Sequence, residues 1–195
     1  AAAARKAIVH LGVYPGYVPP TDQPTATLIG GTLVVEDVEA VTMITVKGFV
    51  TGLEVVNQGG WHIHTGYTCA TESEVGGHYF PGMINDPWNT VRYASDARGV
   101  APIDSFHADF SLTGVNPVLG RAVVVHNSEG TRVGCGLIEP FAGEVVTVGR
   151  YPAYIGATQV RGVLAVANGL SGRLHFVGTL TGLLPSTTGG WHVHA

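Results

Sequence analysis

Short apolar runs rich in Val, Ile, Thr and Leu recur along the whole chain, and Gly, Pro, Asn or Asp interrupts them every eight to twelve residues. Apolar residues rarely recur at the spacing that marks the buried face of a helix, so the pattern indicates strands joined by tight turns. It predicts strands near residues 6–13, 25–36, 40–50, 60–65, 90–94, 105–112, 120–127, 132–138, 143–149, 159–167, 172–180 and 190–194. The predicted fold class is therefore an all-β sandwich or barrel.

Part of this sequence pattern occurs twice in the chain. The segment VKGFVTGLEVVNQGGWHIH at 46–64 aligns with FVGTLTGLLPSTTGGWHVH at 176–194 at an offset of 130 positions, and YPGY at 14–17 matches YPAY at 151–154 at an offset of 137. The difference of seven residues fits a longer loop in the first copy, which we place in the proline-rich VPPTDQPT. Self-similarity of this kind is typical of tandem repeats. We expect a complete unit over 1–142 and the N-terminal part of a second unit over 143–195.

Composition agrees with a strand-rich fold and narrows the partners. Of the 195 residues 45% are hydrophobic and 12% are charged, with 28 Gly and 11 Pro, which suits short strands and turns. The formal net charge is −4 and the ten Lys and Arg residues are spread from Arg5 to Arg173 rather than grouped, so we expect no nucleic-acid partner. The apolar runs are much shorter than the roughly 20 residues that a membrane helix needs, so we also expect no membrane span.

The two cysteines, Cys69 and Cys135, allow three interpretations from the residues alone. They could form a disulfide, remain buried free thiols, or bind a metal. No C-x-x-C motif is present, which excludes a zinc finger.

Histidines supply the candidate chemistry. In a strand, residues two apart point to the same face, so His62 and His64 present two imidazoles together while Trp61 and Ile63 point the other way. Alone, this H-x-H motif also fits surface or hydrogen-bonded histidines. Two more histidines extend it, because His78 lies in the loop VGGHYFPG and His126 ends the strand GRAVVVH. Four neutral imidazoles suit copper, although zinc would accept them too.

The order of these motifs resembles the copper/zinc superoxide dismutase family. H-x-H, a Cys, Gly-x-His-aromatic, GRAVVVH and TRVGCGLI follow one another as in that family, over about residues 25 to 140. The resemblance implies a Greek-key β-barrel or sandwich, followed here by the first strands of a second repeat. It also implies a set of copper ligands: His62, His64, His78 and His126.

Further roles are carried over by the same resemblance. Arg132, three residues before Cys135, is implied to guide the anionic substrate, and Cys69 and Cys135 are implied to form a disulfide. A persistent disulfide indicates an oxidising location, so we expect a secreted or extracellular protein.

Two departures from the family pattern change the expected cofactor. The zinc subsite of the family needs two more histidines and an aspartate, but no histidine lies between His78 and SDARGVA, where only Asp86 and Asp96 offer ligands. Only five residues separate His126 from Arg132, where the conventional enzymes insert a long charged loop. We therefore expect copper without zinc, in an open site. Both losses resemble the copper-only branch of the family, and the tandem arrangement and the GGHYF and DPW segments resemble its copper-only repeat proteins.

The expected reaction is the dismutation of superoxide to oxygen and hydrogen peroxide. His78 would release a proton to the reacting oxygen and Arg132 would guide superoxide, so these two are the expected catalytic residues. A carboxylate would replace zinc at the far nitrogen of His78, and the sequence leaves Asp86 and Asp96 as equal candidates.

A structural or extracellular assembly protein is the alternative function, with copper binding vestigial or used for storage. The incomplete second unit favours self-association or pairing with a neighbouring repeat. Its His192 and His194 are the start of a second metal site that lacks further ligands. Trp61 and Trp191 are expected in the core, and the isolated histidines are expected to be structural or exposed: His10, His107 and His175.

Overall fold

The computed structural model describes residues 5–19, 29–169 and 173–194. Residues 20–25 of the predicted proline-rich loop and residues 25–28 of the second predicted strand lie outside the described ranges. In the described residues, no helix is long and apolar enough to cross a membrane.

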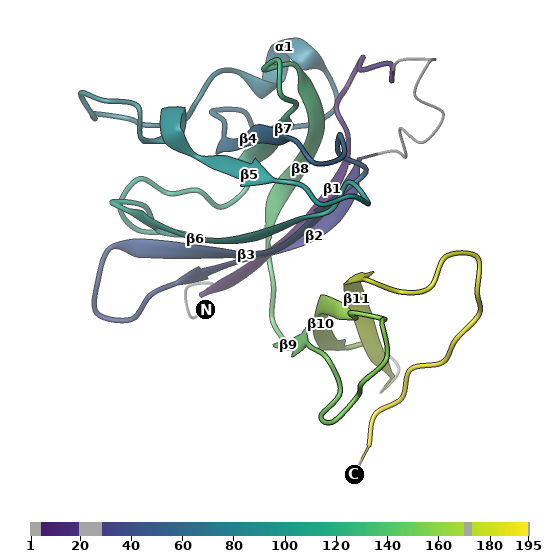
Figure 1. Cartoon of the computed structure of the whole chain (residues 1–195). Helices are drawn as coiled ribbons and strands as arrows, with labels where there is room; N and C mark the ends of the chain where they lie inside the picture. The colour runs from purple at the N-terminus through teal and green to yellow at the C-terminus, as the bar shows by residue number, and fades with distance from the viewer. Residues whose placement is uncertain (1–4, 20–28, 170–172, 195) are drawn as a thin grey trace.

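Eight antiparallel strands form a nearly closed barrel (Figure 1). In sheet order they are β5 (Arg92–Ala94), β4 (Gln58–Ile63), β7 (Ala122–His126), β8 (Arg132–Pro140), β1 (Lys6–Val13), β2 (Gly30–Asp37), β3 (Met43–Thr51) and β6 (Ala101–Ala108). The two end strands, β5 and β6, lie next to each other. The pairs β3–β6 and β4–β7 are not consecutive in the chain, so the connections cross as in a Greek key. The predicted all-β barrel is confirmed.

The barrel core is filled by the inward side of the strands and by aromatic residues of the long connections. Trp61 and Ile63 of β4 lie in this core and are almost fully buried. The connection from β4 to β5 contains two single turns, α1 (Glu72–Val75) and the 3₁₀ helix η1 (Pro87–Thr90). Trp88 of η1 packs on Trp61, which fixes this connection against the barrel.

One strand of the barrel is displaced from its predicted position. The sequence pattern predicts residues 105–112, whereas β6 spans Ala101–Ala108 and pairs along its length with β3. Asp109 adopts a positive φ of 66° and ends the strand. Phe110 and Leu112 are fully buried although they belong to the following loop, and their hydrophobicity was mistaken for a strand signal.

A separate three-stranded antiparallel sheet follows the barrel, in the order β11 (Leu174–Thr181), β10 (Arg161–Asn168) and β9 (Glu144–Val148). Its register repeats that of the first three strands. Leu164 lies opposite Val146 and Gly178, as Leu33 lies opposite Val9 and Gly48. The predicted boundary at residue 142 falls between β8 and β9, and the division into a complete and an incomplete unit stays a prediction.

The end of the chain differs from expectation. Residues 191–194 form no strand, so the strand predicted at 190–194 is wrong. Trp191, expected in a core, is 55% exposed and contacts Phe176 of β11, with ring centroids 4.7 Å apart. In the first unit the equivalent segment is β4, which is held on both sides by β5 and β7. No described strand plays that part beside residues 190–194.

Candidate metal centre

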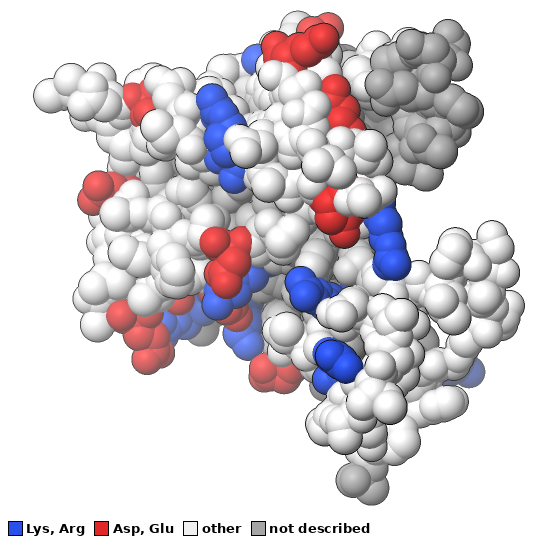
Figure 2. All heavy atoms as spheres, viewed as in Figure 1, with Lys and Arg blue, Asp and Glu red and all other residues white. Residues whose placement is uncertain are grey.

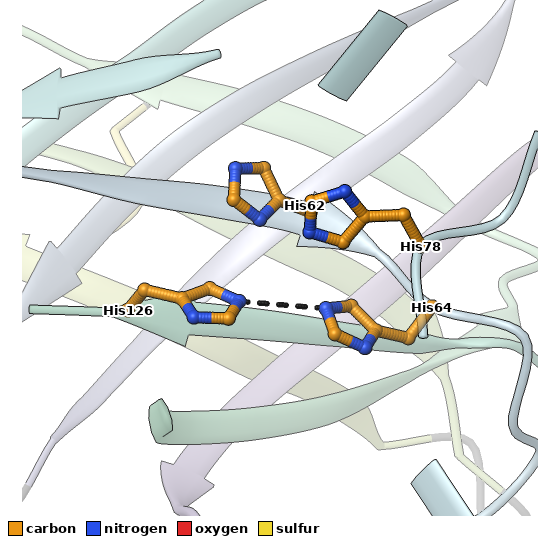
Figure 3. Close-up of side chains that lie close together, drawn as sticks. All are labelled: His62, His64, His78 and His126. Atoms are coloured by element: carbon orange, nitrogen blue, oxygen red, sulfur yellow. Dashed lines mark hydrogen bonds between the residues drawn. The ribbon is translucent and has the colours of Figure 1, made fainter. Parts of the chain in front are cut away.

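Four histidines from three parts of the first unit converge on one point (Figure 3). His62 lies in β4 and His64 follows that strand directly, while His126 ends the neighbouring β7. His78 is brought alongside by a bridge between its backbone and that of His64. One nitrogen from each imidazole lies within 4.8 Å of all the others. The four predicted ligands therefore form one cluster.

Backbone and carboxylate groups orient three of these rings through their Nδ1 atoms. His64 Nδ1 lies 2.9 Å from the Gly76 carbonyl, His126 Nδ1 lies 3.0 Å from the Gly130 carbonyl, and His78 Nδ1 lies 2.6 Å from Asp86 Oδ2. A carbonyl or carboxylate oxygen can only accept, so each Nδ1 carries the proton. The Nε2 atoms are then lone-pair donors, and those of His64 and His126 face each other at 3.4 Å.

His62 is the ring without a partner. It is 6% exposed, and neither of its nitrogens has a hydrogen-bond partner among the described residues. Burying an unpaired polar group costs about 1 to 3 kcal/mol, so an arrangement of this kind needs a reason. A metal ion bound by the ring would remove that cost. The residues present fit a metal ion.

The two glycines before Trp61 make room for this ring. A Cβ atom at Gly60 would lie 2.8 Å from His62 Cε1 and Nε2, closer than real Cβ contacts allow. A Cβ atom at Gly59 would collide with the His126 carbonyl and the Tyr93 hydroxyl. The Gly-Gly-Trp-His motif is therefore explained by packing around the candidate metal ligands.

Burial favours the neutral form of three of the imidazoles, and the neutral form is the one that binds metals. The pKa of His62 is lowered to about 3, chiefly by burial and then by the neighbouring charges of His126, His78 and His64. Burial likewise lowers the pKa of His64 to about 3, against the opposing hydrogen bond to Gly76. The pKa of His126 is also lowered, chiefly by burial.

The spacing suits a single ion after a small contraction. Imidazole nitrogens bind zinc or similar ions at about 2.0 to 2.1 Å, which places opposite ligands about 4 Å apart. The present separations of up to 4.8 Å exceed this by less than about 1 Å. All four donors are nitrogen, a set that suits copper and zinc alike.

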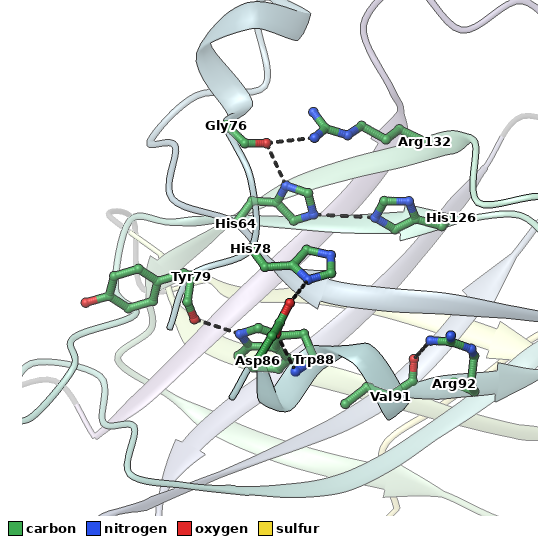
Figure 4. A network of polar contacts seen from close by, with 10 residues as sticks. All are labelled: His64, Gly76, His78, Tyr79, Asp86, Trp88, Val91, Arg92, His126 and Arg132. Atoms are coloured by element: carbon green, nitrogen blue, oxygen red, sulfur yellow. Dashed lines mark hydrogen bonds and ion pairs between the residues drawn. The ribbon is translucent and has the colours of Figure 1, made fainter. Parts of the chain in front are cut away.

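The structure separates the two aspartates that the sequence left as equal candidates (Figure 4). Asp86 holds His78 Nδ1 with one carboxylate oxygen, and its other oxygen accepts a hydrogen bond from the Trp88 backbone at the start of η1. Asp96 lies elsewhere, where its carboxylate accepts hydrogen bonds from the backbones of Arg98 and Val100 within its own turn. Only Asp86 is in contact with the histidine cluster.

Arg132 lies on the His64 side of the cluster. Its Nη2 donates to the Gly76 carbonyl at 2.8 Å, the same oxygen that orients His64, and its Nη1 donates to the Tyr14 hydroxyl at 2.9 Å. The residue is partly buried. A permanent positive charge is thus fixed beside a candidate ligand.

A disulfide joins Cys69 to Cys135, with Cα atoms 5.9 Å apart. It ties the connection after β4 to β8, the strand that begins with Arg132. The segment that supplies Gly76 and His78 is therefore cross-linked to the strand that supplies the arginine.

A hollow of about 510 Å³ opens over the cluster. Its lining includes three of the histidines and a group of polar residues that the sequence did not single out: Asn89, Arg92, Asn127 and Ser128. Arg92 lies on β5 and is paired with Gly60 of β4. Strand pairing across 32 positions leaves no local signal, so Arg92 could be found only from the structure.

The second pair of histidines is placed differently. His192 and His194 are both exposed, and their ring centroids are 6.4 Å apart, the same separation as those of His62 and His64. Within the described residues they belong to no group of three or more metal-binding side chains.

Fold, histidine cluster and disulfide together define a class of metal-binding β-barrel, and comparison with known proteins gives its family. No family model matches the chain. Superoxide dismutase (Cu-Zn) 2 of Mesembryanthemum crystallinum is 33% identical over 120 residues, covering 48% of this chain and 76% of the relative. The chain belongs to the copper/zinc superoxide dismutase family.

A solved structure shows the same fold. The crystal structure of the clock protein EA4 covers 71% of this chain and 96% of its own, with a TM-score of 0.54 and 22% identity. At this identity the likeness concerns the fold alone.

Proposed function

We propose that this protein is a copper-dependent superoxide dismutase that works without zinc, of the copper-only repeat type. One observation carries the proposal: four imidazoles converge, and the fourth, His78, has its outer nitrogen held by the Asp86 carboxylate. The family of the chain supports superoxide as the substrate.

The donor set and its surroundings favour one copper ion. Among divalent first-row ions copper binds nitrogen ligands most tightly. A second metal would need the Nδ1 atom of His78, but Asp86 lies 2.6 Å from that atom. Among the described residues, the four histidines are the only group of three or more candidate ligands. These features support copper at His62, His64, His78 and His126, and no zinc.

The residues around the cluster divide the work of the proposed reaction. Bound copper would supply the electron exchange, taking an electron from one superoxide ion to give oxygen and returning it to a second, which leaves as hydrogen peroxide with two protons. Asp86 keeps the Nδ1 proton of His78 in place, so the ring turns Nε2 toward the cluster. His78 Nε2 would take up a proton from solvent while it is not bound to the ion and then deliver that proton to the second superoxide, and water in the open hollow would supply the other.

Arg132 supplies attraction for the anion. The chain has a formal net charge of −4, which repels superoxide at long range. The guanidinium stays charged at all relevant pH values and is fixed by Gly76 and Tyr14. It would offset that repulsion at the site.

Metal analysis joined to a superoxide decay assay tests this proposal. Protein exposed to copper and zinc together should retain about one copper per chain and no zinc, and should accelerate superoxide decay. His126→Ala should abolish the activity and weaken copper binding by more than the roughly 10- to 100-fold typical of changes around a ligand. His175→Ala, which alters an exposed histidine of β11, is the matched control. Copper well below one per chain, or full activity in His126→Ala, would contradict the proposal.

An assembly function is the second candidate, and the sheet of β9, β10 and β11 favours it. Large apolar side chains are exposed on this part of the chain: Tyr151, Ile155, Leu184, Trp191 and Val193. Neither outer strand of the sheet has a further partner among the described residues. Concentration-dependent oligomers or fibres in sedimentation experiments would support assembly, and a monomer at all concentrations would oppose it.

We also propose a secreted or extracellular location. The disulfide between Cys69 and Cys135 is compatible with an oxidising compartment. Charged residues are sparse and of mixed sign on the face shown in Figure 2.

A further inference from the structure

A second arginine reaches the histidine cluster from the side opposite Arg132 in the view of Figure 4. Arg92 of β5 is paired with Gly60 of β4, and Gly60 precedes His62 by two positions. Because side chains two apart on a strand share a face, Arg92 projects on the histidine side of the sheet. A Cβ atom at Gly60 would lie 3.5 Å from Arg92 Nη1 and 2.8 Å from His62 Nε2. The guanidinium therefore stands beside His62.

Arg132 and Arg92 differ in how many of their N–H donors are already used in hydrogen bonds within the protein. Both terminal nitrogens of Arg132 donate hydrogen bonds, to Tyr14 and Gly76, and Arg132 is not part of the lining of the hollow. Arg92 is exposed, lines the hollow, and within the described residues donates one side-chain hydrogen bond, to the carbonyl of its neighbour Val91. A guanidinium has five N–H donors, so most of those of Arg92 have no acceptor among the described residues.

Charge makes this position important for an anion. Among the described residues, Arg92 is the one lysine, arginine, aspartate or glutamate that lines the hollow. An acidic group stands just behind it, because Glu54 accepts a hydrogen bond from the backbone of Ser128, a lining residue. Without Arg92, an anion entering the hollow would meet the charge of Glu54 with no nearby cation at the mouth.

We propose that Arg92 is an anion-steering residue, which draws superoxide and other small monovalent anions through the hollow to the face of the cluster formed by His62 and His126. The assignment of superoxide rests on the proposed function, whereas the binding of small anions follows from the charge and placement of Arg92. Asn89, Asn127 and Ser128 add polar groups to the same lining. Arg132 holds its charge at the other side of the cluster, so an anion is attracted from both sides.

Three substitutions in the full chain, loaded with copper, test this role. Arg92→Gln removes the charge, Arg92→Lys keeps it, and Arg98→Gln removes an equal charge from an exposed arginine that does not line the hollow. We expect Arg92→Gln to slow superoxide decay by about 3- to 10-fold at low ionic strength and to flatten its dependence on salt. Arg92→Lys should retain most of the rate, and Arg98→Gln should change it by less than about 1.5-fold.

Azide titration of the copper-loaded protein, followed by its visible absorption, gives a readout independent of turnover. Azide affinity should fall several-fold in Arg92→Gln and stay unchanged in Arg98→Gln, while copper content and thermal midpoint stay the same in both. If wild type binds copper but does not consume superoxide, the proposed function fails and the azide comparison still decides the role of Arg92. Unchanged azide affinity and unchanged salt dependence in Arg92→Gln would overturn the inference, and so would failure of the wild type to bind copper.

Discussion

The Gly-Gly-Trp-His-x-His motif occurs at residues 59–64 and again at 189–194, and its two copies have different structures. In the first unit Trp61 is 1% exposed, and His62 and His64 are buried beside His78 and His126. In the second, Trp191 is 55% exposed and both histidines face solvent. The two imidazoles of each motif are nevertheless equally spaced, with ring centroids 6.4 Å apart. The motif sets the spacing of its two imidazole rings, but a metal site also needs the neighbouring strands and the loop that carries His78.

The two tryptophans should differ most in their contribution to stability. Trp61→Ala removes a side chain packed in the barrel core, which typically costs about 3 to 5 kcal/mol in the free energy of unfolding. Trp191→Ala removes a half-exposed ring that contacts Phe176, and should cost less than about 1 kcal/mol. Urea denaturation of both variants measures the difference. Equal losses of unfolding free energy in the two variants would mean that the second motif is also packed in a core.

The disulfide is the next difference, since only the first unit has one. Replacing Cys69 and Cys135 by serine opens a loop of 66 residues, and the chain-entropy estimate for that length is about 4 kcal/mol. We expect the double variant to unfold at correspondingly lower urea, and the reduced wild type to behave in the same way. A midpoint equal to that of the oxidised wild type would show that the connection is held by packing alone.

Asp86 contacts the histidine cluster that includes the first motif. Among the described residues, the histidines of the second motif have no such contact. Asp86→Asn keeps the shape of the side chain but weakens its hold on the His78 Nδ1 proton, and should lower dismutase activity by about 10- to 100-fold. The pH profile of activity should also shift, because the proton donor is altered. Asp96→Asn is the matched control, since the Asp96 carboxylate accepts its hydrogen bonds from Arg98 and Val100 of its own turn. Equal effects of the two substitutions would remove the proposed role of Asp86.

Acid should weaken the first unit through a buried histidine that is not a candidate ligand. His107 is 8% exposed and packs against Trp61 and Trp88, and burial lowers its pKa to about 4. The unfolded chain takes up this proton below about pH 6.5 and the folded chain does not until about pH 4, so stability falls as the pH drops through that range.

His107→Phe removes this titration and keeps an aromatic ring in place. Between pH 6.5 and 5, metal-free His107→Phe should lose about 1 to 2 kcal/mol less stability than the metal-free wild type. The other buried histidines titrate in both proteins and cancel in the comparison. Parallel pH dependence in urea denaturation would show that His107 titrates normally in the folded chain.

Local patterns predicted much of the barrel because its strands alternate and are separated by turn residues. The motif order placed His62, His64, His78 and His126 in one cluster before any geometry was known. Position along β6 was wrong because the buried loop residues Phe110 and Leu112 carry the same hydrophobic signal as a strand. The prediction of a strand at 190–194 was wrong because a repeated motif does not supply the neighbouring strands, β5 and β7, that hold β4 in place.

Features that depend on tertiary contacts lay beyond the sequence. Asp86 and Asp96 are equivalent as letters, and only the start of η1 directs the Asp86 carboxylate toward His78. Arg92 gave no signal, because its approach to His62 depends on the pairing of β4 with β5.

The central claim is that the motif at 59–64 forms part of the metal site and the motif at 189–194 does not. A copper titration followed by electron paramagnetic resonance tests this claim most directly. We predict one tightly bound copper per chain with nitrogen hyperfine structure from imidazole, lost in the His62→Ala/His64→Ala double variant. The spectrum and stoichiometry should be unchanged in the His192→Ala/His194→Ala double variant. Two equivalent coppers per chain, or a copper signal that survives in the first variant and disappears in the second, would contradict the account.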